Sequence, residues 1–178
     1  MVAEKLGISC YDAELIEQIA EQSGYSAEYI KQEAEYGTGG WLSAVFADRS
    51  AGLTNQDKMF SIQSRIIEEL ANEGPCVIVG RCADFVLRDK ADCLNVFIHA
   101  SMEKRAERIV KEYGERAESP EKRLKDKDKR RKAFYQLYTD LKWGDVRNYQ
   151  IALDSGIIGI DKCADIICEL YRGLRNEH

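Results

Sequence analysis

The side chains best suited to chemistry in this chain are cations, and the first of them follows a short apolar run. Arg81 comes directly after residues 76–80, whose composition is typical of a buried strand ending in glycine. In an open α/β sheet, the loop after a strand faces the ligand crevice. An arginine there can grip a phosphate or a carboxylate through two parallel hydrogen bonds. The alternative is a structural arginine that pairs with Asp84 or Asp89 and fixes a helix start.

A second group of cations lies in residues 122–132, which hold eight basic side chains and two acidic ones, Asp126 and Asp128. Pairs of Asp126 with Arg130 and of Asp128 with Lys132, four residues apart, would make this a solvated, self-paired helix. Because eight cations exceed what two carboxylates neutralise, the run also suits a lid that offsets charge on a transferring phosphoryl group. Nucleic-acid binding is a third interpretation of the same charges.

Two acids are expected at strand ends, Asp12 after the first strand and Asp154 after the last. Asp12 can act as a helix cap and Asp154 as a turn former. At the carboxyl edge of a sheet, either could instead hold a substrate hydroxyl, an amine or a metal-bound water. Both interpretations stay open on the sequence alone.

Several classes of protein are disfavoured. The glycine-rich residues 37–40 are not followed by Gly-Lys-Ser/Thr, and neither Gly-x-Gly-x-x-Gly after a strand nor Gly-x-Ser-x-Gly occurs. Six cysteines without a Cys-x-x-Cys pair and only two histidines give no reason to expect a metal site. The net charge of −5 argues against nucleic acid and anionic membranes as partners, and no apolar run could span a bilayer. We therefore expect a reduced, cytoplasmic protein.

The elements that must position these side chains alternate between helix and strand. Strands are expected at residues 8–11, 76–79, 94–99 and 149–153. Helices are expected at residues 1–6, ended by Gly7, at 13–22, 26–36 and 81–88, and after Ser101 and Ser119. A helix from residue 54 is expected to bury one apolar face, formed by Met59, Ile62, Ile66, Ile67 and Leu70. The last helix is expected to have an apolar face from Cys163 to Leu174. Residues 37–53 have no regular pattern. Such alternation predicts a parallel sheet with helices on both faces, in one domain over residues 1–178.

Taken together, four stretches resemble the cytidylate kinase-like branch of the P-loop nucleoside monophosphate kinases. They are residues 3–12, residues 74–84 with Gly80-Arg81, the Asp-Lys-Asp-Lys-Arg-Arg of residues 126–131, and residues 148–155 with Leu153-Asp154-Ser155. They follow one another in the family's order and cover most of the chain. The resemblance implies a three-layer P-loop kinase-like fold, with an acceptor-side excursion at about residues 25–60 and a lid at about 115–145.

The same resemblance implies transfer of the γ-phosphoryl group of ATP to a nucleoside monophosphate, with Mg²⁺. It implies no protein ligand to a metal and leaves the residues that bind ATP unassigned. A homodimer stays open. Arg81 would grip the acceptor, with Asp12, Asp84 and Lys127 as further binding residues. The implied catalytic residues are Asp128, Arg130 and Arg131.

Two departures from the family pattern bear on function. Bacterial cytidylate kinases carry Gly-Arg-Asp where this chain has Gly-Arg-Cys82, which puts cytidine specificity in question. The family also opens with a strand and a phosphate loop, roughly 20 residues that this sequence lacks. Since that strand lies centrally, we expect a longer natural protein whose start precedes Met1. The alternative to an active phosphotransferase is a catalytically impaired nucleotide-binding or regulatory module.

Overall fold

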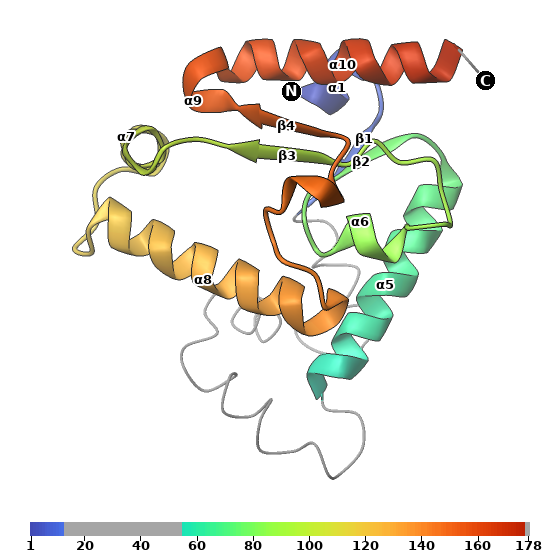
Figure 1. Ribbon diagram of the computed structural model, residues 1–178, viewed down its shortest axis with the longest axis horizontal. Helices are drawn as coiled ribbons and strands as arrows, with labels where there is room; N and C mark the ends of the chain where they lie inside the picture. The colour runs from blue at the N-terminus through green and yellow to red at the C-terminus, as the bar shows by residue number, and fades with distance from the viewer. Residues whose placement is uncertain (13–54, 177–178) are drawn as a thin grey trace. The chain divides into compact units, whose positions relative to one another are not determined.

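The computed structural model describes residues 1–12 and 55–176 (Figure 1). The chain divides into two compact units. One unit comprises residues 1–7 and 92–178, and the other residues 8–91. The described strands form two parallel pairs, β1 with β2 and β3 with β4, and the expected central strand is not among them. The fold is therefore mixed α/β, with small parallel sheets flanked by helices.

The unit of residues 8–91 is built around β1 (Ser9–Tyr11), α5 (Asn55–Glu73), β2 (Cys76–Ile78) and α6 (Ala83–Val86). In its core, the predicted apolar face of α5 packs against α6, and Tyr11 and Ile78 of the two strands pack against this cluster. The buried side chains are Ile66, Ile67, Leu70, Ala83, Val86 and Leu87. Ile66 and Ile67 are almost wholly inaccessible, at 1% and 0% exposure, so the apolar period read from the sequence does mark the buried side of α5.

The other unit begins with α1 (Val2–Leu6), which ends where Gly7 adopts a left-handed φ of 67°. It continues with β3 (Val96–His99), α7 (Met102–Tyr113), α8 (Pro120–Thr139), the 3₁₀ turn η1 (Val146–Asn148), β4 (Ile151–Asp154), α9 (Ser155–Ile158) and α10 (Ile160–Asn176). The predicted helix starts are confirmed. The side chains of Ser101 and Ser119 accept hydrogen bonds from the backbone amides of Lys104 and Lys122, three residues later in each case. None of the described helices is both long and apolar enough to cross a membrane.

The β3–β4 pair carries aromatic side chains on one face. Val96 pairs with Ile151 and His99 with Asp154, so Phe97 and His99 share a face and stack at 6.2 Å. The Phe97 ring also packs against Tyr149, with ring centroids 4.9 Å apart, and makes a T-shaped contact with Trp143, with centroids 5.3 Å apart. A side chain in place of the glycine hydrogen at Gly144 would lie 3.2 Å from the Phe97 ring. This cluster fixes the chain between α8 and β4 against the sheet.

The apolar face expected on the last helix is only partly right. Cys163 is buried, but Leu170 and Leu174 are 41% and 48% exposed, while the smaller Ala164 and Cys168 are buried at 4% and 3%. The buried side of α10 faces the short helix α1, and small side chains allow that close approach. The side of a helix that is buried thus depended here on its neighbour rather than on the size of its apolar residues.

Candidate functional site

The first group of candidate residues lies at the carboxyl edge of the β1–β2 sheet. Tyr11 pairs with Ile78, and the amide of Val79 donates to the carbonyl of Tyr11 at 3.1 Å, so the ladder runs to the ends of both strands. Asp12 follows β1 directly and is exposed, whereas Arg81 follows β2 and is half-buried. Parallel strands end at the same edge. The fold of this unit therefore brings Asp12 and Arg81 to one edge of the sheet. The helix that Asp12 was expected to cap lies outside the described residues.

The turn that carries Arg81 has an unusual backbone. Gly80, Arg81 and Cys82 have φ values of 73°, 57° and 56°, all in the left-handed region. Glycine adopts this conformation at no steric cost, but for each of the other two it costs about 1–2 kcal/mol. Gln63 of α5, which is only 6% exposed, donates from Nε2 to the carbonyl of Arg81 at 2.9 Å. Strained backbone of this kind persists where the surroundings hold it, and it clusters at functional sites.

Cys82, which stands in place of the family's aspartate, is directed into the core. Its side chain is 4% exposed, and it precedes α6. Burial raises the pKa of the Cys82 thiol to about 12; the charge of Asp84 adds to this, and that of Arg81 opposes it. The group is therefore a neutral thiol at physiological pH. It offers no carboxylate to a ligand, and Asp84, half-buried in the first turn of α6, is the nearest acid in sequence.

The second group lies on α8, in the other unit. Both carboxylate oxygens of Asp128 accept hydrogen bonds from Arg105 of α7, at 2.7 and 2.8 Å. This bidentate pair is partly buried, with side-chain exposures of 26% for Arg105 and 16% for Asp128. Arg131 approaches the same carboxylate at 3.5 Å. Within the part of the chain that the structure describes, Asp128 makes its ion pairs with Arg105 and Arg131, and not with Lys132 as the four-residue spacing predicted.

Burial and the surrounding cations act on Asp128 in opposite directions. Partial burial tends to raise the pKa of its carboxyl group, but the hydrogen bonds and charge of Arg105, helped by Arg131 and Lys132, lower it below the ordinary value. Asp128 is therefore ionised at neutral pH. It joins α8 to α7 and places the guanidinium of Arg131 beside a fixed negative charge.

The cations of α8 divide between two faces of the helix. With 3.6 residues per turn, one face, here called the arginine face, holds Arg123, Lys127, Arg130 and Arg131. Phe134 and Tyr138, whose rings lie 4.9 Å apart, continue the line of Lys127 and Arg131 along the helix. Nη1 of Arg123 is buried and has no hydrogen-bond partner among the described residues. A buried cationic donor without an acceptor suits an anion.

At the carboxyl edge of the β3–β4 sheet, Asp154 acts as a helix cap. Its Oδ1 accepts a hydrogen bond from the amide of Gly156 at 2.9 Å, which opens α9. The hydroxyl of Ser155 donates to the carbonyl of His99 at 3.0 Å, and His99 Nδ1 lies 3.9 Å from Oδ2 of Asp154. The sequence suggested a turn former or a ligand-binding acid at Asp154, and the structure shows a helix cap there. Among the described residues, no group of three His, Cys, Asp or Glu side chains is arranged to hold a metal ion.

Two residues of the site could not be found from the sequence. Gln63 lies within an apolar helical pattern, where a single glutamine does not stand out. Arg105 lies 23 residues before its partner, Asp128, on a different helix. Only the docking of α7 on α8 reveals that pair, although the excess of cations around Asp128 was already evident.

Comparison with known proteins places the chain in a family. The sequence model of the cytidylate kinase-like family matches residues 1–157. The chain belongs to this family. Membership indicates a nucleotide kinase-like function and the use of nucleotides. Among curated proteins, none matches the sequence.

A solved structure supports the same fold. The chain is similar to the crystal structure of an uncharacterized protein from Eubacterium ventriosum, with 25% sequence identity and a TM-score of 0.71. The similarity covers 97% of this chain and 88% of that one. The predicted resemblance to cytidylate kinase-like proteins is thus confirmed, as is the α/β fold class.

Proposed function

We propose that this protein is a nucleoside monophosphate kinase-like phosphotransferase, which moves the γ-phosphoryl group of ATP to a cytidylate-like nucleoside monophosphate. The observation that carries the proposal is the left-handed turn of residues 80–82, held by Gln63, at the edge of a parallel sheet in a member of this family. A strained turn that presents an arginine at the edge of a sheet is suited to the capture of a phosphate.

In this proposal, Arg81 grips the acceptor phosphate, and Asp12 and Asp84 lie at the acceptor side. Lys127 adds positive charge from the lid. The proposed catalytic residues all lie on α8 and are Arg130, Arg131 and Asp128. Arginine can stabilise the charge that spreads over the equatorial oxygens of a transferring phosphoryl group. Asp128, held by Arg105, would fix the direction in which Arg131 reaches.

The ATP and Mg²⁺ that the family implies fit the described residues unequally. The arginine face suits nucleotide phosphates, and the orphaned Nη1 of Arg123 supports an anion there. For Mg²⁺ the described residues offer no cluster of acidic ligands, so we derive no step through the metal. Bound metal in such enzymes is carried largely by the nucleotide phosphates.

A nucleotide-binding module without turnover is the second candidate. It needs only the acceptor residues that follow the strands of the β1–β2 sheet. The same acceptor residues would then bind a monophosphate for regulation rather than reaction.

Titration and turnover separate these candidates. The protein is titrated with CMP, dCMP, UMP and AMP by calorimetry, and ATP use is followed in a coupled assay. The variant Arg81→Ala should bind the monophosphate about 10- to 100-fold more weakly than the wild type, because it loses a bidentate, charge-assisted contact. The matched control is Arg88→Ala, which removes an exposed arginine stacked on Phe85 in the same unit. Binding with turnover supports the kinase, and binding alone supports the module. Unchanged affinity in Arg81→Ala would show that the acceptor site is elsewhere.

A further inference from the structure

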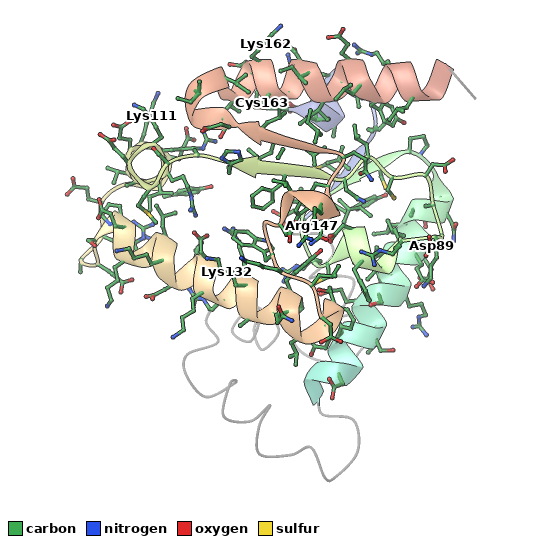
Figure 2. All side chains as sticks on the ribbon, viewed as in Figure 1. Asp89, Lys111, Lys132, Arg147, Lys162 and Cys163 are labelled. Carbon is green, nitrogen blue, oxygen red and sulfur yellow. The ribbon has the colours of Figure 1, made fainter. Side chains whose placement is uncertain are left out.

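A groove between α7 and α8 presents a line of lysines that the proposed function does not use. It has a volume of about 600 Å³ and is lined by Met102 of α7 and by side chains of α8. Figure 2 shows the place of one of its lysines, Lys132, on α8. The lining residues are Met102, Lys125, Asp128, Lys129, Lys132, Ala133 and Gln136. We call this feature the lysine groove.

The three lysines of the groove repeat with the period of the helix. Lys125, Lys129 and Lys132 are exposed and are spaced by four and three residues, so they project from successive turns on one side of α8. At a rise of 1.5 Å per residue, their line is about 10 Å long, and with 3.6 residues per turn it lies nearly opposite the arginine face. Donors that bind a single phosphate converge on it, as a bidentate guanidinium does. These three lysines lie side by side instead, which suits a partner whose negative charges are also arranged in a line.

The groove lysines form no ion pair within the part of the chain that the structure describes. Three other lysines pair with glutamates: Lys90 with Glu68, Lys104 with Glu107 and Lys122 with Glu118. Asp128 lines the groove, but both of its oxygens accept hydrogen bonds from Arg105. The three ammonium groups therefore keep their charge for acids of another molecule.

We propose that the lysine groove is a docking surface for an acidic amphipathic helix of a partner protein, which places three carboxylates opposite the three lysines. Side chains three and four residues apart on a helix are neighbours, about 5–6 Å from one another, so acidic residues with this spacing repeat at the same interval as the lysines. Met102, Ala133 and the aliphatic stems of the lysines offer apolar contact to the other residues of such a helix. Recognition of an amphipathic helix in a groove is a recurring mode of peptide binding. The inference does not depend on the proposed phosphotransferase activity.

An acidic helix fits the groove better than a nucleic acid does. Single strands bind through aromatic side chains on which the bases stack, and the described lining of the groove contains no aromatic residue. Non-specific binding of a duplex relies on many phosphate contacts, of which three lysines supply few. The net charge of −5 belongs to the whole chain. Since exposed charges are screened beyond about 8 Å at physiological salt, it does not keep a short acidic helix from three local cations.

The test uses the whole chain and a labelled, alanine-based synthetic helix of about 18 residues, long enough to be helical in water. It carries three glutamates, spaced by four and three residues, with leucines beside them, and binding is followed by fluorescence anisotropy at about 0.15 M salt. The wild type should bind this aligned peptide at least about tenfold more tightly than a peptide with glutamine at the same positions. A third peptide, with three glutamates on different sides of the helix, should bind as weakly as the glutamine peptide.

Variants of the protein locate the binding surface. Lys125→Gln/Lys129→Gln/Lys132→Gln should lose the tenfold preference for the aligned peptide. The control, Lys111→Gln/Lys142→Gln/Lys162→Gln, removes the same charge at exposed positions outside the groove lining and should keep that preference. Lys129→Glu should bind the aligned peptide weakly and regain affinity for a peptide with lysine at the central acidic position, a rescue that a misfolded variant cannot show.

Two kinds of result would overturn the proposal. Equal weakening in both triple variants, or equal binding of the peptides with aligned and scattered glutamates, would mean that the protein responds only to overall charge. Tighter binding of inorganic tripolyphosphate or of a single-stranded oligonucleotide than of the aligned peptide would identify the groove as a phosphate site instead.

Discussion

Removal of the Arg105 side chain should destabilise the protein more than loss of an ordinary surface ion pair. Arg105 binds both oxygens of Asp128 at 2.7 and 2.8 Å, and the two side chains are 26% and 16% exposed. Breaking a fully buried pair costs about 3–5 kcal/mol, and breaking an exposed one about 0–1 kcal/mol. Because this pair is partly buried and Arg131 remains 3.5 Å from Asp128, we expect Arg105→Ala to lower the free energy of unfolding by about 1–3 kcal/mol.

A matched control is Arg108, which lies on the same helix as Arg105, α7. Arg108 pairs with Glu112 at 3.8 Å, with exposures of 54% and 45%, so Arg108→Ala should cost less than about 1 kcal/mol. Urea unfolding of both variants, and of Asp128→Ala with the double variant, gives the coupling energy. If Arg105→Ala cost no more than Arg108→Ala, the pair would not hold α8 on α7.

The pH dependence gives a second, independent reading of this pair. The pKa of Asp128 is lowered in the folded protein, since the hydrogen bonds and charge of Arg105 outweigh the effect of burial. The stabilisation is therefore fully present above the unfolded pKa of an aspartate and is lost as the pH falls through the lowered folded value. The difference in stability between the wild type and Arg105→Ala should shrink over that acidic range. A difference that stayed constant would refute the electrostatic explanation.

Two further predictions concern the turn at the end of β2. Gln63→Met should lower the free energy of unfolding by about 1–2 kcal/mol, as measured by urea unfolding, because it removes the hydrogen-bond donor to the carbonyl of Arg81. The same substitution should weaken monophosphate binding measured by calorimetry, and an unchanged affinity would mean that the turn does not support the acceptor site. Cys82, whose pKa burial raises to about 12, should be alkylated by iodoacetamide far more slowly than the exposed Cys10, as followed by mass spectrometry; similar rates would show that the thiol is accessible.

Much of the fold could be predicted because local rules determine it. Ser119 followed by proline predicted the start of α8, and the apolar period from residue 54 predicted the buried side of α5. The parallel pairing followed from strands that alternate with helices. Features that depend on a neighbour could not be predicted in this way, such as the exposure of Leu170 on α10.

The candidate site likewise combines local features, which the sequence predicts, with features that depend on a neighbouring element, which it does not. The position of Arg81 after a strand is a local feature, and the sequence predicted it. Its left-handed backbone and its support by Gln63 depend on how α5 packs beneath the turn, which no spacing reveals. For Asp128, the sequence predicted a partner on its own helix, but a bidentate partner on α7 competes better because its planar fork matches both oxygens.

The Arg105–Asp128 pair determines how the carboxylate of Asp128 is used. Asp128 is partly buried, and both of its oxygens accept hydrogen bonds from Arg105 of α7, at 2.7 and 2.8 Å. Without Arg105, the ion pair that remains to Asp128 among the described residues is the one with Arg131, at 3.5 Å. A planar guanidinium matches two carboxylate oxygens at once, which the ammonium group of a lysine on the same helix cannot do. Because Arg105 binds in this way, Asp128 joins α8 to α7 and keeps a fixed negative charge beside Arg131.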